Sequence, residues 1–187
     1  MTNIKTTQYK RFNIEYWSDD YSDSPRDWDN IGKMACFHKR YDLGDKHHFN
    51  DAEDLIDFIQ DNSKEIVFLP IFAYEHGNIT ISTRPFSCRW DSGQIGFIYA
   101  YKKDMIENGH KSEEDMLEVL RQEVKTYDDY IVGNVYGYTI TDDEGEMLDS
   151  CGGFIGDFNY VEREAELSAD YYDNKLPQQL DIAFSFA

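Results

Sequence analysis

The sequence is poor in cysteine and proline, with only 3 and 4 of them among 187 residues. Cys36, Cys88 and Cys151 are odd in number and widely spaced, and each has apolar or aromatic neighbours. These features exclude a disulfide framework of the kind that small secreted proteins use, and they predict reduced, mostly buried thiols. Because thiols stay reduced in a reducing compartment, we expect the protein to be located in one.

Long apolar runs are also missing. No stretch approaches the ~20 apolar residues that a helix needs to cross a bilayer. The first five residues, Met1-Thr2-Asn3-Ile4-Lys5, lack the apolar segment of a secretory signal. We therefore expect a cytoplasmic protein that does not enter membranes.

Basic residues are the third shortage. The chain has 18 Lys and Arg against 37 Asp and Glu, which gives a formal net charge of -19 at pH 7. Such a chain repels nucleic acid and anionic membranes, because binding would bring like charges together and recruit counterions rather than release them. Direct binding to DNA or RNA is therefore the least expected function. The same charge attracts basic surfaces, including the channels of proteins that themselves bind nucleic acid.

Aromatic residues, in contrast, are abundant, at 16% of the chain. They predict a core built from large rings. The length and the absence of a low-complexity linker predict one domain over residues 1–187. Apolar periodicity predicts an α+β fold, in which a mostly antiparallel sheet carries two to three helices packed on it.

The elements are predicted from local patterns. Alternation of apolar and polar residues predicts strands over 9–17, 66–83 as a hairpin, 93–101, 135–141 paired with 146–155, and a short last strand at Ile182, Phe184 and Phe186. Helical spacing and capping residues predict helices from Asn50 or Asp51 to about 62, from Ser112 to about 127, and over about 159–172. Asp, Ser and Pro predict a loop over 18–30.

Metal sites are weakly indicated. Possible zinc ligands are present, but Cys36 and His38 are closer in sequence than the usual pairing of two to four residues between zinc ligands. The turn Asp142-Asp143-Glu144-Gly145 lacks the twelve-residue spacing of a calcium loop. We expect no metal and no cofactor.

Catalysis is one alternative. The segment from Cys88 to Gln94 could hold a nucleophile, either Cys88 or Ser92, with His38 or His76 as the base. The glycines of Cys151-Gly152-Gly153 could free backbone N–H groups for an oxyanion, although glycines within a strand more often mark a bulge or close packing. The alternative function is therefore an enzyme or a small-ligand-binding protein with a pocket near Cys88–Gly93 and Cys151–Gly153.

Acidic clusters are spread along the chain, and they could imitate the phosphates of a duplex if the fold places them on one face. A generally solvated surface is the simpler interpretation, because acidic residues favour solubility without any partner. The clusters are at 19–23, 51–57, 113–115, 142–144 and 162–166.

Three segments resemble a loosely defined group of small acidic proteins encoded by bacteriophages and mobile elements of Gram-positive bacteria. They are Asp23-Ser24-Pro25-Arg26-Asp27-Trp28-Asp29-Asn30, Arg40-Tyr41-Asp42-Leu43-Gly44-Asp45 and the stretch from Trp90 to Tyr99. The resemblance implies a mobile-element setting in a host bacterial cytoplasm, where small acidic proteins often counter restriction or CRISPR systems. It implies no catalytic residue.

The preferred hypothesis is an anti-defence inhibitor whose acidic surface mimics nucleic acid and occupies the basic channel of a host restriction or CRISPR nuclease. No bond is made or broken in this function. The predicted partner-binding residues are exposed acids and two aromatic anchors, namely Asp19, Asp20, Tyr21, Asp23, Asp27, Trp28, Glu113, Glu114 and Asp115. A third possibility is an accessory protein of the mobile element that binds another protein through a Tyr-rich surface.

Overall fold

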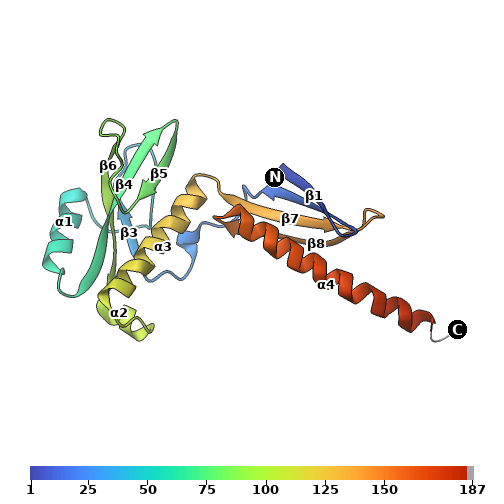
Figure 1. Cartoon of the computed structure of the whole chain (residues 1–187). Coiled ribbons are helices and arrows are strands. Elements are labelled where there is room, and N and C mark those ends of the chain that lie inside the picture. The colour runs from blue at the N-terminus through green and yellow to red at the C-terminus, as the bar shows by residue number, and fades with distance from the viewer. Residues whose placement is uncertain (185–187) are drawn as a thin grey trace. The chain divides into compact units, whose positions relative to one another are not determined.

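The computed structural model describes residues 1–184, with side chains through Lys175. The α+β class is confirmed, because the chain forms two antiparallel sheets of four strands with helices packed on them (Figure 1). Contacts divide the chain into two compact units. Unit 1 combines Met1–Asp23 with the chain from Gly133 onward, and unit 2 is Ser24–Val132. One domain over residues 1–187 stays a prediction, since the placement of the units relative to one another is not determined.

Unit 1 is a sheet with a helix along one face (Figure 1). Its strand order is β1 (Thr2–Tyr9), β2 (Phe12–Ser18), β7 (Val135–Thr141) and β8 (Met147–Ile155), followed by helix α4 (Phe158–Phe184). Alternate residues of β2, such as Phe12 and Ile14, are buried against α4. The helix meets them with Val161, Ala165 and Ala169, which are four residues apart and so lie on one helical face. Their small size lets the helix approach the sheet closely.

Two elements of unit 1 differ from the sequence-based prediction. Strand β1 was not predicted, because its side chains are polar and mostly exposed, and its position at the edge of the sheet requires no apolar alternation. The predicted last strand is wrong, since residues 182–184 belong to α4, and Phe186 lies outside the described residues. A pattern of three alternating apolar residues is too short to stop helix α4 from continuing through this segment.

Unit 2 is a sheet covered by a helix on each face (Figure 1). The strand order is β3 (Lys33–Cys36), β6 (Ser92–Tyr101), β4 (Ile66–His76) and β5 (Asn78–Ser82), and the helices are the short 3-10 turn η1 (Pro25–Asp27), α1 (Ala52–Asp61), α2 (Lys102–Glu107) and α3 (Glu113–Ile131). Helix α3 packs Leu120 and Val124 on one face, and α1 packs Leu55 and Ile59 on the other. Burial from both sides explains why β4 is an almost unbroken apolar run.

The local signals in unit 2 are largely confirmed. Strand β5 pairs with β4 only from Phe72 onward, so Pro70 lies where β4 has a free edge, and a register shift follows Ile71. Asp51 accepts hydrogen bonds from the backbone N–H groups that begin α1, and Ser112 does the same for α3. Helix α2 was not predicted, because six residues are too few to show a helical period.

The cysteines match the sequence-based expectation only in part. All three are free thiols, and Cys36 is buried in unit 2. Cys88 is partly buried, whereas Cys151 is exposed on β8, which is an edge strand. The expectation of mostly buried thiols is therefore wrong for Cys151, because its apolar sequence neighbours do not cover an edge position.

Candidate functional site

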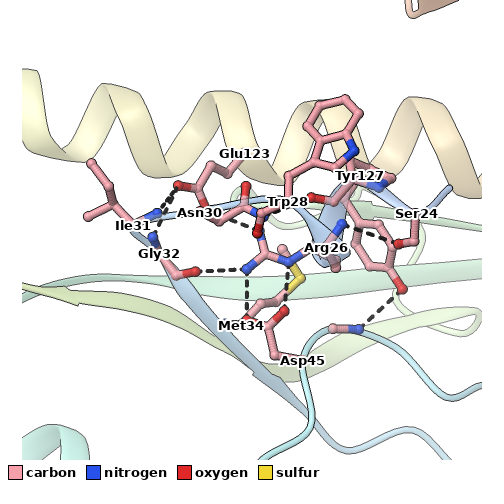
Figure 2. Close-up of polar contacts among 12 residues, drawn as sticks. Ser24, Arg26, Trp28, Asn30, Ile31, Gly32, Met34, Asp45, Glu123 and Tyr127 are labelled. Carbon is pink, nitrogen blue, oxygen red and sulfur yellow. Dashed lines mark hydrogen bonds and ion pairs between the residues drawn. The ribbon is translucent and has the colours of Figure 1, made fainter. Parts of the chain in front are cut away.

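A buried arginine organises one edge of unit 2 (Figure 2). The Arg26 side chain is 5% exposed, and it follows the buried ring of Pro25. Its Nε and Nη2 donate to the two carboxylate oxygens of Asp45 at 2.9 and 2.7 Å, and its Nη1 donates to Glu123 at 3.0 Å. Nη2 also donates to the carbonyl of Gly32 at 2.7 Å. The guanidinium thus ties the loop that contains it to two other segments of unit 2.

Both carboxylates around Arg26 have further partners. Asp45 also accepts the backbone N–H of Met34 at 2.8 Å, and Glu123 accepts those of Ile31 and Gly32 at 3.1 and 3.0 Å. Burial would lower the pKa of Arg26, but the hydrogen bonds and charges of Asp45 and Glu123 outweigh it and raise that pKa. The Arg26 guanidinium therefore stays charged, and its hydrogen bonds hold the loop in one conformation.

The loop presents a tryptophan to solvent. The side chain of Asn30 donates to the carbonyls of Pro25 and Trp28 at 2.7 and 3.1 Å, and the Ser24 hydroxyl accepts from the N–H of Arg26. These bonds fix the backbone on both sides of the indole. Nevertheless, Trp28 is 53% exposed. An exposed ring on a fixed backbone is the usual form of an interface anchor.

A groove of about 340 Å³ lies between this loop and α3. Trp28 lines it from the loop, and α3 contributes Asp115, Glu118, Gln122 and three further residues. Its lining contains three carboxylates and no basic side chain. A groove of this kind favours a cation with an apolar or planar face.

Part of the predicted partner-binding set meets at this groove. Trp28 and Asp115 both line it, and the exposed Asp27 precedes Trp28. Glu113 and Glu114 are exposed in the first turn of α3, where they pair with Lys102 and Arg121. Asp115 accepts the N–H of Lys111 and lies 3.2 Å from the His110 ring nitrogen.

The other predicted residues belong to unit 1. Asp19 has an internal role, because it accepts the backbone N–H of Tyr21 at 3.2 Å and that of Gly153 at 2.9 Å. Asp20 lies 3.7 Å from the N-terminal ammonium. Tyr21 is 80% exposed, and Asp23 is exposed. Partner binding by these four residues stays a prediction.

The glycines of β8 have a packing role. Gly152 faces the Trp17 ring, and a Cβ at this position would lie 2.7 Å from that ring. Gly153 adopts a φ of 79°, and its N–H is bonded to Asp19. The strand pairing also shifts register opposite these glycines. The bulge interpretation is therefore confirmed, and the N–H of Gly153 is already used.

Helix α1 has an acidic row that the sequence-based site did not include. Glu53, Asp57 and Asp61 are exposed and four residues apart, so their carboxylates follow one helical face at steps of about 6 Å. Among the described residues, no ion pair involves any of them. The four-residue spacing, together with the lack of Lys and Arg over Ala52–Asp61, is the sequence signal that indicates this row.

The alternative pocket exists in unit 2 and has a volume of about 570 Å³. Of the predicted segment Cys88–Gly93, residues Trp90–Gly93 line it, whereas Cys88 does not; His38 is also in the lining. Glu75 lies between His38 and Arg40 in this lining. Cys151 and Gly153 belong to unit 1 and do not line the pocket.

The predicted nucleophile and base are not brought together in this pocket. Cys88 donates to Asp91 at 3.5 Å, and His76 lies 3.6 Å from the same carboxylate oxygen. The Ser92 hydroxyl donates to the Cys88 carbonyl. No described hydrogen bond joins Cys88 or Ser92 to a histidine. A carboxylate thus lies between thiol and imidazole, which is not the nucleophile–base contact that covalent catalysis uses.

Among the side chains that the structure describes, no group of three or more His, Cys, Asp or Glu is placed to hold a metal ion. No helix in the described part of the chain combines the length and the apolar character needed to cross a bilayer. Comparisons of the chain with protein-family models, curated proteins and solved structures find no match. The resemblance to small acidic phage proteins stays an expectation.

Proposed function

We propose that this protein is a stoichiometric inhibitor that binds a basic partner protein through the acidic surface of unit 2. The observation that carries the proposal is Trp28, an exposed ring on a fixed backbone, flanked by Asp27 and Asp29 and beside the acidic helix α3. Aromatic anchors supply much of the affinity of protein interfaces, and complementary charge supplies rapid association.

The charge of α3 supports this proposal. The helix has seven acidic residues against two basic ones, and both basic residues are engaged by acids of the same helix. Arg121 pairs with Glu114 and Glu118, and Lys125 pairs with Asp129. Hydrogen bonds from Gln122 and Arg121 lower the pKa of Glu118, so it stays ionised at neutral pH. The helix therefore retains a net negative charge that a basic partner could neutralise.

The partner we propose is a nucleic-acid-binding protein of the host, such as a restriction or CRISPR nuclease. Its basic channel normally holds phosphates, and a surface of fixed carboxylates can compete for the same contacts. The net charge of -19 supports this choice, because it adds long-range attraction to the local groove. The phage-like setting implied by the sequence resemblance gives such an inhibitor a use.

The test is capture of partners from a lysate of a defence-proficient bacterium on the immobilised full chain, with elution at rising salt and identification by mass spectrometry. We expect one basic nuclease that elutes at moderate salt and loses DNA binding when the inhibitor is equimolar. The double variant Asp27→Asn with Asp29→Asn should lower its recovery about tenfold, because two rim charges and their field are lost.

The matched control is Asp143→Asn with Glu144→Gln, which removes the same charge from an exposed turn of unit 1. The control should leave recovery unchanged. If no basic protein is retained at low salt, or if the control lowers recovery equally, the proposal is wrong.

Small-ligand binding is the second candidate function. The pocket of about 570 Å³ favours it, because its size lies within the usual range of ligand sites, ~300–1,000 Å³. Trp90 on its rim is 96% exposed, so a large apolar surface is available there. Capture that yields no basic partner would favour this candidate over the inhibitor.

A further inference from the structure

We infer that the groove beside Trp28 receives an arginine side chain of the partner, which stacks on the indole and pairs with Asp27 or Asp29, the exposed residues that flank Trp28 in sequence and lie outside the groove lining. This inference rests on the proposed function, and it names the chemistry that the surface recognises. It depends on three properties of this surface: the charge of the groove, its aromatic face and the availability of the two carboxylates that flank Trp28 in sequence.

The charge of the groove selects a cation. Asp115, Glu118 and Glu123 line it, and no Lys, Arg or His is among the lining residues. Arg26 balances the charge of Glu123, but its buried guanidinium donates inward to Asp45, Glu123 and a backbone carbonyl and is not among the lining residues of the groove. An anion would be repelled here, and a neutral ligand would gain nothing from the carboxylates.

The aromatic face selects arginine over lysine. Trp is the best ring for cation–π attraction, and Trp28 is held with about half of its surface exposed. A guanidinium is planar, so it can stack on an indole while its N–H groups point sideways to a carboxylate. A lysine ammonium is a compact and strongly hydrated charge that cannot stack in this way.

Asp27 and Asp29 are available for the new ion pair. Both are exposed, and no ion pair or side-chain hydrogen bond among the described residues involves them. The other carboxylates are already engaged, Glu123 by Arg26 and Glu118 by Arg121. These engaged groups add to the field of the groove, whereas Asp27 and Asp29 can form new contacts.

The size of the groove agrees with a single side chain. Its volume of about 340 Å³ is at the lower end of the range for small-molecule sites. One flat cationic side chain, which enters between the loop and α3, would cover the indole and part of α3.

The test compares two short peptides of equal length and charge, one with arginines and one with lysines at the same positions. Each is titrated into the full-length protein, and the indole N–H signal of Trp28 is followed by NMR, with its assignment from Trp28→Phe. The arginine peptide should shift this signal and bind about two- to fivefold more tightly than the lysine peptide, as expected for an exposed cation–π contact.

Variants separate stacking from charge. Because these variants lack the Trp28 indole signal, calorimetric titration measures their affinities. Trp28→Ala should lower the affinity for the arginine peptide to that for the lysine peptide, and Trp28→Phe should retain part of the difference. Asp27→Asn with Asp29→Asn should lower the affinity for both peptides. Trp90→Ala, which removes another exposed indole of unit 2, should change neither. Circular dichroism of each variant checks that the fold is retained.

The outcomes distinguish this inference from the proposed function. Equal affinity of the two peptides, or an unshifted Trp28 signal, overturns the arginine inference even if the basic nuclease is still captured. Selective binding of the arginine peptide without capture of a nuclease supports the groove and overturns the inhibitor proposal alone.

Discussion

The two units differ in where their carboxylates meet cations. In unit 1, cations from β1 and the turn after it pair with α4: Lys5 with Glu162, Lys10 with Asp170 and Asp173, and Arg11 with Asp173. In unit 2, one buried arginine binds two carboxylates, and acids on the loop and on α1 have no described cation beside them. In unit 1 the pairs join the sheet to one helix, whereas unit 2 buries one arginine among its acids and leaves those on the loop and on α1 without a described cation.

The difference depends on where the few cations lie rather than on the net charge. A composition of 18 basic and 37 acidic residues leaves many acids without a partner, but it does not say which. Asp19 belongs to the most acidic part of the 18–30 loop, yet it is bonded to two backbone N–H groups of unit 1. The useful property of an acidic surface is therefore the set of carboxylates that the fold itself does not use.

The largest expected effect is the loss of the Arg26 cluster. Arg26→Met should lower the free energy of unfolding by about 3–5 kcal/mol, because it leaves Asp45 and Glu123 as uncompensated, mostly buried charges. Urea unfolding followed by circular dichroism measures this change.

The matched control for that change is Arg121→Met on α3. Arg121 also pairs with two carboxylates, but these pairs are on the surface, and such pairs contribute little. A loss of stability from Arg121→Met as large as that from Arg26→Met would contradict the distinction between buried and surface pairs.

A smaller, pH-dependent effect is expected in unit 1. Hydrogen bonds from Lys10 and Tyr9 lower the pKa of Asp170 below its ordinary value of 3.8, against the opposing effect of burial. The pKa of Asp170 is lower in the folded protein than in the unfolded chain. The stabilisation that ionised Asp170 provides is therefore complete above the unfolded pKa and is lost as the pH falls through the folded pKa. Lys10→Gln should therefore destabilise the protein at pH 7, and the difference from the unaltered protein should shrink as the pH falls through the folded pKa of Asp170.

Urea unfolding at a series of pH values measures this dependence. Lys33→Gln is a suitable control, since Lys33 is exposed and has no described ion pair. An effect of Lys10→Gln that is equal at both ends of the pH range would show that the lost interaction is not electrostatic.

The smallest expected effect is a difference in labelling rate between one thiol of each unit. Burial, with the nearby charge of Asp45, raises the pKa of Cys36 to about 12, so little reactive thiolate forms there. Cys151 is exposed on β8. Iodoacetamide at mildly alkaline pH should label Cys151 and leave Cys36 unlabelled until urea unfolds the chain, as measured by mass spectrometry. Equal labelling rates in the folded protein would contradict the burial of Cys36.

Much of the fold could be predicted because its signals are local. Asp51 and Ser112 stand directly before the helices that they cap, and Gly77 supplies the positive φ of the β4–β5 turn. The division into two sheets could not be predicted in this way. Ile14 pairs with Ile140, although all of unit 2 lies between them in the sequence. No local pattern indicates which distant strands pair.

The candidate site shows the same limit. Trp28 and Asp115 were predicted from exposure and charge, but the groove that joins them depends on Arg26, which was not singled out. A signal was present, since Arg26 is the sole basic residue between Arg11 and Lys33, in an acidic segment. A single basic residue among acids can pair with carboxylates from several segments. Its partners Asp45 and Glu123 could not be identified, because they are distant in sequence.

The insertion of unit 2 between β2 and β7 has a consequence for synthesis on the ribosome. All of unit 2 is one continuous segment, so it can fold as soon as Val132 has emerged. Strand β2 must wait much longer, because both of its covering partners, β7 and α4, are made last. Until then the apolar face of β2, with Phe12, Ile14 and Tyr16, is exposed in the nascent chain. The proposed binding surface of unit 2 is thus complete before the N-terminal strands have formed their sheet.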